Sequence, residues 1–191
     1  MKKIILASAS PRRKELLEAI GLDFEIDPGE YVEDMQTEME PHTLTRSISL
    51  GKAGAVAERH ENAIIIAADT IIFFRNQILG KPHTEAEARR MLAALSGHSH
   101  SVITGFTILD TDERRIASQS VETKVHIKPL DVEEIDAYVK SGESLDKAGA
   151  YAVQGLGAVI VERIEGDYSN VVGLPLKALA ESLKGFGIHI L

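Results

Sequence analysis

The chain has 191 residues and a mass of 20.8 kDa, and its 44% hydrophobic and 26% charged residues are typical of a folded globular domain rather than a disordered or fibrous protein. With 21 Lys and Arg against 29 Asp and Glu, the net charge is −8, which argues against nucleic acid or an anionic membrane as a partner. The chain has no cysteine, so a disulfide framework, a thiolate nucleophile and a cysteine-bound metal are excluded.

The first part of the chain predicts a strand followed by a helix. The β-branched run Lys3–Ala7 is typical of a strand that is buried on both faces. Ser10 and Pro11 predict the start of a helix, because serine is a good N-cap and proline fits the first helical turn. The helix is expected to end at Gly21.

Strands and helices continue to alternate along the rest of the chain. The run Ala63–Phe74 is too rich in β-branched residues for a helix and predicts two strand segments that meet near Asp69. Capping boxes predict helices that begin after Thr84 and Asp131. The remaining predicted strands are Ser101–Leu109, Ala117–Ile127 and Ala158–Ile164, and the remaining predicted helices are Leu44–His60 and about Pro175–Leu183.

This alternation indicates the α/β class, and the two adjacent strands in the middle of the chain imply a mixed sheet. The sequence has no repeat, low-complexity tract or linker. We therefore expect a single domain over residues 1–191, built in two lobes.

The segment Ser8–Arg13, with the sequence SASPRR, is a candidate anion site. Arg12 and Arg13 fall at the second and third positions of the predicted helix, where a cation opposes the helix dipole by about 0.3–1 kcal/mol. Two guanidinium groups beside free backbone N–H groups suit phosphate. The alternative is that both side chains are merely solvated, and the helix start that Pro11 fixes favours the phosphate interpretation.

Asp69 lies inside the apolar run IIIAADTII, where a buried carboxylate needs a partner. At the carboxyl end of a strand it would orient a water as general base or bind a divalent cation, and a structural role in a turn or bulge fits the pattern equally well. Lys52, on the apolar arc of its helix, and Lys81, after a turn, are candidate anion contacts. Glu33, in an acidic loop, is a candidate metal ligand, and a solvated side chain is the simpler interpretation of all three.

The segment Ser141–Gly157 is rich in glycine and alanine, which predicts either backbone that passes close to a ligand or a series of turns. Gln154 within it carries an amide that can read the edge of a base. His98 and His100 alternate on a predicted strand, but no third residue has the spacing of a metal ligand.

Several familiar signals are absent from the sequence. It has no phosphate loop, dinucleotide fingerprint, nucleophile elbow or HExxH motif. The N-terminal apolar run is too short for a signal peptide, and no stretch approaches the length of a membrane span. We therefore expect a cytoplasmic protein without a membrane partner.

Taken together, these segments resemble the Maf family of nucleoside triphosphate pyrophosphatases over nearly the whole chain. The matching motifs are LASASPRR at Leu6–Arg13, AADT at Ala67–Thr70, ILGKP at Ile78–Pro82, LSGHSHSVITG at Leu95–Gly105, DKAGAYAVQGLG at Asp146–Gly157 and NVVGLP at Asn170–Pro175. Several motifs in the right order are far more specific than any one of them. His126 departs from the more apolar pattern expected there, but it touches no expected functional position.

The resemblance implies a mixed, strongly twisted sheet flanked by helices, in two lobes with a central cleft, as in inosine triphosphate pyrophosphatases. It also implies a hydrolase that acts on phosphoric anhydrides and cleaves a nucleoside triphosphate between its α and β phosphates, with Mg²⁺ or Mn²⁺ as cofactor, and it favours a homodimer. Asp69 matches the catalytic acceptor, and Glu33 together with Asp69 matches the metal site. The implied substrate contacts are Ser8, Arg12, Arg13, Lys52, Thr70, Lys81 and Gln154.

Three positions indicate the branch of the family. Arg12, Thr70 and Gln154 match positions linked to substrate choice in the branch that acts on dTTP and UTP. The 7-methyl-GTP branch typically has another, often aromatic, residue in place of Arg12 and a glutamate near Gln154. We therefore expect dTTP and UTP, or modified pyrimidine nucleotides, as substrates. The alternatives are the same chemistry on 7-methyl-GTP and a non-catalytic nucleotide sensor in cell-division control.

Overall fold

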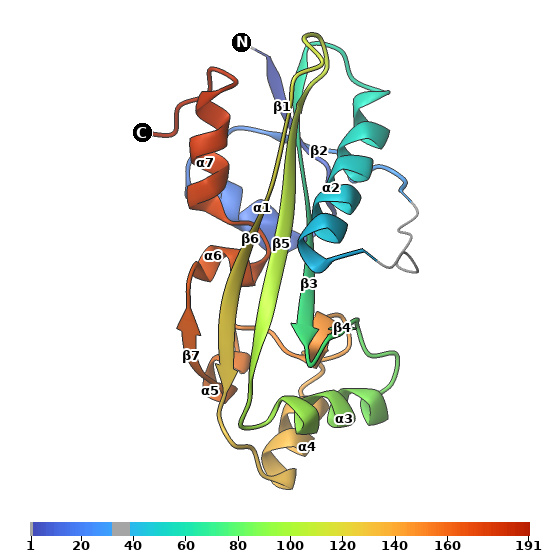
Figure 1. The fold of residues 1–191 in the computed structure, drawn as a ribbon, viewed down its shortest axis with the longest axis vertical. Coiled ribbons are helices and arrows are strands. Elements are labelled where there is room, and N and C mark those ends of the chain that lie inside the picture. Colours follow the sequence, from blue (N-terminus) through green and yellow to red (C-terminus); the bar gives the residue numbers. More distant parts are fainter. Residues whose placement is uncertain (1, 32–38) are drawn as a thin grey trace. The chain divides into compact units, whose positions relative to one another are not determined.

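The structure is a computed structural model that describes residues 2–31 and 39–191 (Figure 1). The chain divides into two compact units, the first made of Met1–Thr70, Thr104–Val121 and Gly173–Leu191 and the second of Ile71–Ile103 and Glu122–Val172. Three long strands, β3 (Ala63–Phe74), β5 (Ser99–Asp110) and β6 (Ile116–Ile127), contribute residues to both units.

The strands pair in the order β2 (Glu25–Ile26), β1 (Lys3–Leu6), β3, β5, β6 and β7 (Val161–Glu165), and β4 (Gln77–Leu79) pairs with β3. The β1–β3 pair is parallel, whereas the β3–β4 and β6–β7 pairs are antiparallel. The predicted α/β class, with a mixed sheet flanked by helices, is therefore confirmed. The strong twist, the central cleft and the single functional domain stay predictions.

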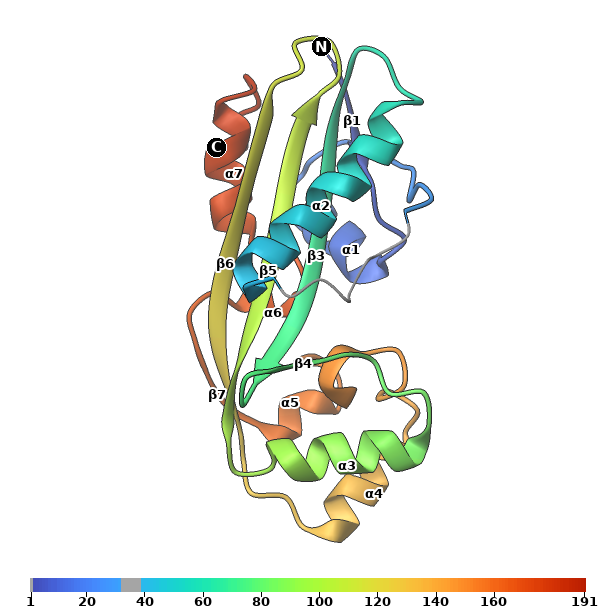
Figure 2. The ribbon, with the colours of Figure 1, turned by 45° about the vertical axis from the view of Figure 1, so that its right-hand side comes forward.

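In the first unit, β1 (Lys3–Leu6) lies between β2 (Glu25–Ile26) and β3. Helices α1 (Pro11–Ala19) and α7 (Leu176–Lys184) cover one face of these strands, and α2 (Pro41–Ala57) covers the other (Figures 1 and 2). Because successive strand residues point to opposite faces, each strand contributes alternate side chains to the two cores.

The two cores differ in the size of their side chains. The core under α1 and α7 is made of large residues, among them Leu6, Leu17 and Phe106. The core under α2 includes several alanines, among them Ala53 and Ala67. Smaller side chains let a helix backbone lie closer to the sheet, so α2 and the residues it carries are placed tightly against β3 and β5.

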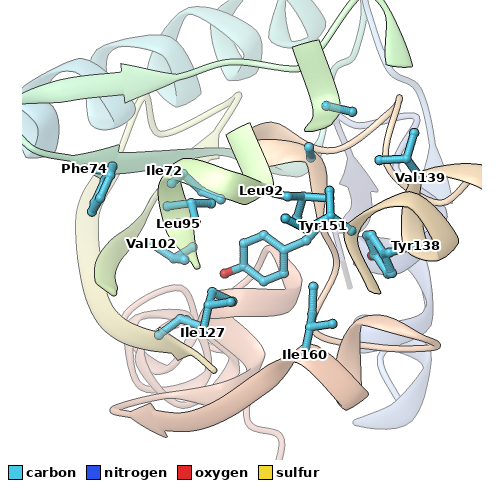
Figure 3. Packing of buried hydrophobic residues seen from close by; sticks show 14 residues of the cluster. Ile72, Phe74, Leu92, Leu95, Val102, Ile127, Tyr138, Val139, Tyr151 and Ile160 are labelled. Atoms are coloured by element: carbon cyan, nitrogen blue, oxygen red, sulfur yellow. The ribbon is translucent and has the colours of Figure 1, made fainter. Parts of the chain in front are cut away.

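The second unit has its own core around Tyr151, whose ring is surrounded by aliphatic side chains (Figure 3). The Tyr151 hydroxyl lies 2.7 Å from His100 Nε2, and burial raises the pKa of Tyr151 above its usual range. The elements of this unit, besides parts of the long strands, are β4 (Gln77–Leu79), α3 (Glu85–Leu95), α4 (Val132–Lys140), η1 (Ala148–Ala150), α5 (Gly157–Ile160), β7 (Val161–Glu165) and α6 (Tyr168–Val172).

The helices predicted to begin at Pro11 and after Thr84 and Asp131 begin there, whereas the helix predicted from Leu44 begins at Pro41, and not every cap forms as expected. Asp131 and Glu134 form a complete capping box at α4. Thr84 accepts from the N–H of Glu87, but the Glu87 carboxylate accepts from the N–H of His83 rather than from that of the N-cap. Ser10 precedes α1 but makes no side-chain cap.

Two predicted strands are wrong in form. Ala63–Phe74 is one continuous strand rather than two segments that meet near Asp69. The stretch predicted as the strand Ala158–Ile164 begins in the short helix α5 and becomes strand only at Val161. In the part of the chain that the structure describes, no helix is long and apolar enough to cross a membrane.

Candidate active site

Asp69 forms a buried ion pair with Lys52. Asp69 lies in β3 on the face that α2 covers, and it is only 8% exposed. Lys52, on α2, donates from Nζ to Asp69 Oδ1 over 2.8 Å. The carboxylate therefore lies within a regular strand and caps no turn, and Lys52 turns its ammonium group to this carboxylate. A buried carboxylate needs such a charged partner, because an unpaired charge is strongly disfavoured away from water.

Arg13 joins three other segments of the chain. Its Nε donates to the carbonyl oxygen of Gly173 over 2.9 Å, and Nη1 and Nη2 donate to Ser8 Oγ and Thr70 Oγ1, each over 3.2 Å. Thr70 Oγ1 in turn lies 2.9 Å from Thr104 Oγ1. The rigid guanidinium fork thus holds the segment after β1, the middle of β3 and the segment before α7 at fixed distances. Arg13 is therefore not the purely solvated side chain of the alternative interpretation.

The ion pair and the Arg13 network lie on opposite faces of β3. Asp69 and Thr70 are neighbours in one strand, so their side chains point to opposite faces. The last β1–β3 register pair is Leu6 with Ile66. Asp69 and Thr70 follow Ile66 in β3, so they lie beyond the carboxyl end of β1. In α/β sheets, ligands bind beyond the carboxyl ends of the strands. A ligand at this end of β1 can therefore contact side chains from both faces.

The other candidate residues occupy more exposed positions. Arg12 is the second residue of α1, as predicted, and is half-buried. Lys81 and Gln154 are exposed and belong to the second unit. Glu33 lies outside the described residues. The structure thus joins Ser8, Arg13 and Thr70 in one network and Lys52 and Asp69 in one pair.

Two glycines of the segment 141–157 are required by packing of the chain on itself. A Cβ at Gly149, where φ is +66°, would lie 2.7 Å from Ile72 Cδ1. A Cβ at Gly157 would lie 1.7 Å from the carbonyl oxygen of Ala152. At these two positions the structure supports the interpretation of the glycines as turn and packing residues.

His98, just before β5, and His100, within β5, each contact other groups of the protein. His98 Nδ1 lies 2.7 Å from the carbonyl oxygen of Ser96, and His100 Nε2 contacts Tyr151. Burial, and then the nearby charges of His126 and Lys124, lower the pKa of His100 to about 4. The His100 imidazole is therefore neutral near pH 7.

The sequence did not single out Thr104 and Gly173 as site residues. Both stand in segments that carried the family resemblance, ITG and VVGLP, so a signal was present. Their contacts with Thr70 and Arg13, however, join residues 34 and 160 positions apart, which no local pattern reveals.

The mixed sheet, with charged and hydroxyl side chains gathered beyond the carboxyl end of β1, defines an α/β protein with a polar site at a strand end. The chain belongs to the Maf family, since the family model described as Maf-like protein matches residues 3–186. The family resemblance of the sequence is thereby confirmed.

Relatives match the chain over its full length. A Methanococcoides burtonii protein named dTTP/UTP pyrophosphatase is 52% identical over 191 residues, which cover 100% of this chain and 98% of the relative. A Methanosarcina mazei protein of the same name is 48% identical over 100% of this chain and 97% of its own length. A Bacillus cereus protein, also named dTTP/UTP pyrophosphatase, is 48% identical over 100% of this chain and 93% of its own length.

Proposed function

We propose that this protein hydrolyses dTTP and UTP to the nucleoside monophosphate and pyrophosphate. Relatives with that printed name are 48–52% identical to it over its whole length, which supports the substrate class. The observation that carries the chemistry is the buried Asp69 carboxylate, held by Lys52 at 2.8 Å beyond the end of β1. Modified pyrimidine nucleotides belong to the same proposal.

The net charge of −8 means that the protein must gather cations locally to bind a triphosphate. Phosphoryl transfer depends on positioning and charge neutralisation more than on a strong nucleophile. We assign the half-buried Arg12 and the exposed Lys81 to the phosphates, because these side chains are accessible to a ligand. Gln154, also exposed, would pair with the edge of the pyrimidine, since its amide both donates and accepts.

Asp69 acts as general base in the proposed reaction. Its carboxylate orients a water molecule and accepts a proton from it as the water oxygen attacks the α-phosphorus. The bond between the α-phosphorus and the bridging oxygen breaks, and pyrophosphate leaves with the electron pair. Lys52 fixes one carboxylate oxygen and places a positive charge beside the reacting phosphate.

A divalent cation, Mg²⁺ or Mn²⁺, is part of this proposal, and the residues at the site fit it. Mg²⁺ is typically held in nucleotide enzymes by one or two carboxylates and the substrate phosphates. Lys52 donates to Oδ1 of Asp69, so Oδ2 would serve as a ligand, and Glu33, outside the described residues, would supply the second carboxylate. Among the described residues, no three His, Cys, Asp or Glu side chains form a cluster for a metal. When bound, the cation neutralises phosphate charge.

Asp69→Asn tests the catalytic assignment. The amide cannot accept the proton, so we expect the release of pyrophosphate from dTTP to fall by about 10²–10⁴-fold, the usual contribution of a general base. Asp110→Asn is the matched control, because Asp110 is also buried and pairs with Lys2 at 2.7 Å, before β1 rather than after it. Asp110→Asn should lower thermal stability and leave the rate per folded molecule unchanged. Full activity in Asp69→Asn would contradict the assignment.

Product analysis on a panel of nucleotides tests the reaction itself. The panel contains dTTP, UTP, ATP, GTP and 7-methyl-GTP, each with Mg²⁺, Mn²⁺ or Co²⁺. We expect pyrophosphate and the monophosphate from dTTP and UTP. Release of inorganic phosphate instead would overturn the proposed bond cleavage, a preference for 7-methyl-GTP would overturn the pyrimidine assignment, and saturable binding without turnover would indicate a nucleotide sensor. The homodimer and the cytoplasmic location remain predictions from the sequence.

A further inference from the structure

The short loop of residues 152–157 carries Gln154, which the proposed function assigns to the edge of the pyrimidine. The loop is tight, because a Cβ at Gly157 would lie 1.7 Å from the carbonyl oxygen of Ala152. Gly155, directly after Gln154, has a φ of +61°, a left-handed conformation that favours glycine. Gln154 itself is exposed. The direction in which it presents its amide therefore depends on how the backbone of this loop is held.

Two side chains of the second unit hold the loop near its two ends. The Tyr138 hydroxyl, on α4, accepts from the N–H of Ala152 over 3.1 Å. Glu143 accepts from the N–H of Leu156 through Oε1 over 3.4 Å. A Cβ at Gly155 would lie 2.9 Å from the same oxygen, so the carboxylate also lies directly against the backbone of the loop.

Tyr138 and Glu143 also interact with each other. Burial raises the pKa of Tyr138, the N–H of Ala152 opposes this shift, and the charge of Glu143 and a hydrogen bond with it raise the pKa further. A carboxylate only accepts hydrogen bonds, so the Tyr138 hydroxyl donates to Glu143 while its oxygen accepts from Ala152. Tyr138 is only 5% exposed and packs in the core of the second unit (Figure 3), which gives both contacts a fixed support.

We propose that Tyr138 and Glu143 position Gln154 for recognition of the pyrimidine, which makes Glu143 a specificity-determining residue that acts through Gln154. This inference rests on the proposed function, in which the Gln154 amide pairs with the base. An amide pairs with the edge of a base only when its donor and its acceptor both face their partners. A loop that is held before the nucleotide arrives loses less conformational entropy on binding, so the contact contributes more to affinity.

Glu143→Ala removes the acceptor at one end of the loop. We expect KM for dTTP and UTP, and Ki for dTMP and UMP as product inhibitors, to rise about threefold to tenfold, which corresponds to the loss of one neutral hydrogen bond with the base. Ki for inorganic pyrophosphate, which has no base, should stay unchanged. Glu143→Gln retains a carbonyl oxygen that can accept from both Leu156 and Tyr138, so it should restore most of the affinity for the nucleotides.

Tyr138→Phe tests the other end of the loop, because it removes the hydroxyl group that holds Ala152 and keeps the ring in the core. It should raise the same KM and Ki values and leave the Ki for pyrophosphate unchanged. Glu134→Ala is the matched control, because Glu134 is another half-buried carboxylate of the second unit, and it accepts from the N–H of Asp131 over 3.1 Å. This control should lower the free energy of unfolding without a change in KM or Ki.

A double-mutant cycle with Gln154→Ala shows whether Glu143 acts through Gln154. In the Gln154→Ala background, Glu143→Ala should have no further effect on kcat/KM for dTTP. Additive effects of the two substitutions would overturn the positioning role. An equal loss of pyrophosphate binding in Glu143→Ala would also overturn it, because pyrophosphate has no base for Gln154 to contact.

The outcomes distinguish this inference from the proposed function. The wild type is assayed first, and failure to release pyrophosphate from dTTP or UTP would overturn the proposed function itself. With an active wild type, unchanged KM and Ki in both Glu143→Ala and Tyr138→Phe would overturn the inference alone. The same rise of KM in Glu134→Ala, or no recovery in Glu143→Gln, would do so as well. Urea unfolding of each variant shows that folded protein is being compared.

Discussion

Arg12 and Arg13 are neighbours in the same motif, yet the structure gives them different surroundings. Pro11 begins α1, so Arg13 lies four residues before Leu17 and on the same side of the helix. Leu17 is buried against the sheet, and Arg13 accordingly reaches Ser8, Thr70 and Gly173. Arg12 is turned by about 100° around the helix and is available to a ligand.

Lysine substitutions separate the two arginines. A lysine at position 13 cannot reproduce three donors in the plane of a guanidinium group, so we expect Arg13→Lys to lower the free energy of unfolding by about 1–3 kcal/mol. Arg12→Lys should change it by less than about 0.5 kcal/mol, because Arg12 is a half-exposed helix residue. Urea denaturation measures both. Equal losses in the two variants would contradict the network role of Arg13.

The sequence could predict which residues belong to the candidate site better than how they contact one another. Ser8, Arg13 and Thr70 were each predicted as contacts of one substrate, which stays a prediction, and the structure adds that Arg13 donates to both Ser8 and Thr70. Those pairs are separated by 5 and 57 residues, and the Arg13–Gly173 contact by 160. Such contacts follow from the pairing of β1 with β3 and from the return of the chain before α7, which have no local signature.

At the scale of elements, the seating of α2 on the sheet places Lys52 at Asp69. Gly105 on β5 lies directly under the helix, and a Cβ there would lie 2.3 Å from the carbonyl carbon of Thr45. Ser49 Oγ on α2 lies 2.8 Å from Thr107 Oγ1 on β5, which fixes the helix along the strand. The helix backbone therefore approaches the sheet as closely as a residue without a side chain allows.

Two glycine-to-alanine variants test this seating. Gly105→Ala forces α2 away from β5, so we expect the protein to lose about 1–3 kcal/mol of stability and most of its pyrophosphatase activity, as Lys52 moves from Asp69. Gly54→Ala, on α2 with nothing within 4 Å of its added Cβ, should gain about 0.5–1 kcal/mol, because alanine favours the helix. Thermal unfolding and product release measure the two effects. Unchanged stability and activity in Gly105→Ala would show that the position of α2 on the sheet does not depend on this contact.

The predicted boundaries of helices and strands were wrong where tertiary contacts outweigh local sequence patterns. A carboxylate in the middle of an apolar run suggested a break in Ala63–Phe74, but Lys52 from α2 satisfies Asp69, and the strand continues. The apolar run from Ala158 is too short for periodicity to separate helix from strand. The helix that forms there begins at Gly157, which passes too close to Ala152 for any side chain.

At the scale of the whole molecule, two groups with strongly lowered pKa values, one buried and one half-buried, contribute to how stability depends on pH. His100 is 3% exposed, and burial lowers its pKa to about 4. Hydrogen bonds from His60 and then Arg59 lower the pKa of Asp27 to about 2. A carboxyl group with a lowered pKa stabilises the fold above its unfolded value and loses that contribution as the pH falls below about 4. His100 therefore affects the free energy of unfolding at a higher pH than Asp27 does.

His100 predicts a loss of stability between pH 6.5 and pH 4. In the unfolded chain an imidazole protonates near pH 6.5. In the folded protein, the pKa of His100 is lowered to about 4, so its imidazole is protonated only near that pH. The unfolded state therefore binds more protons in this range, and the free energy of unfolding falls by up to about 1.4 kcal/mol per pH unit as the pH is lowered.

Urea unfolding followed by circular dichroism, at several values of pH, measures this dependence in a chain without tryptophan. His100→Asn should be less stable at pH 7, because it loses the contact with Tyr151, but its stability should change less between pH 6.5 and pH 4. His189→Gln, at an exposed position near the C-terminus, should retain the wild-type dependence. Parallel curves for the wild type and His100→Asn would show that other groups cause the loss of stability in acid.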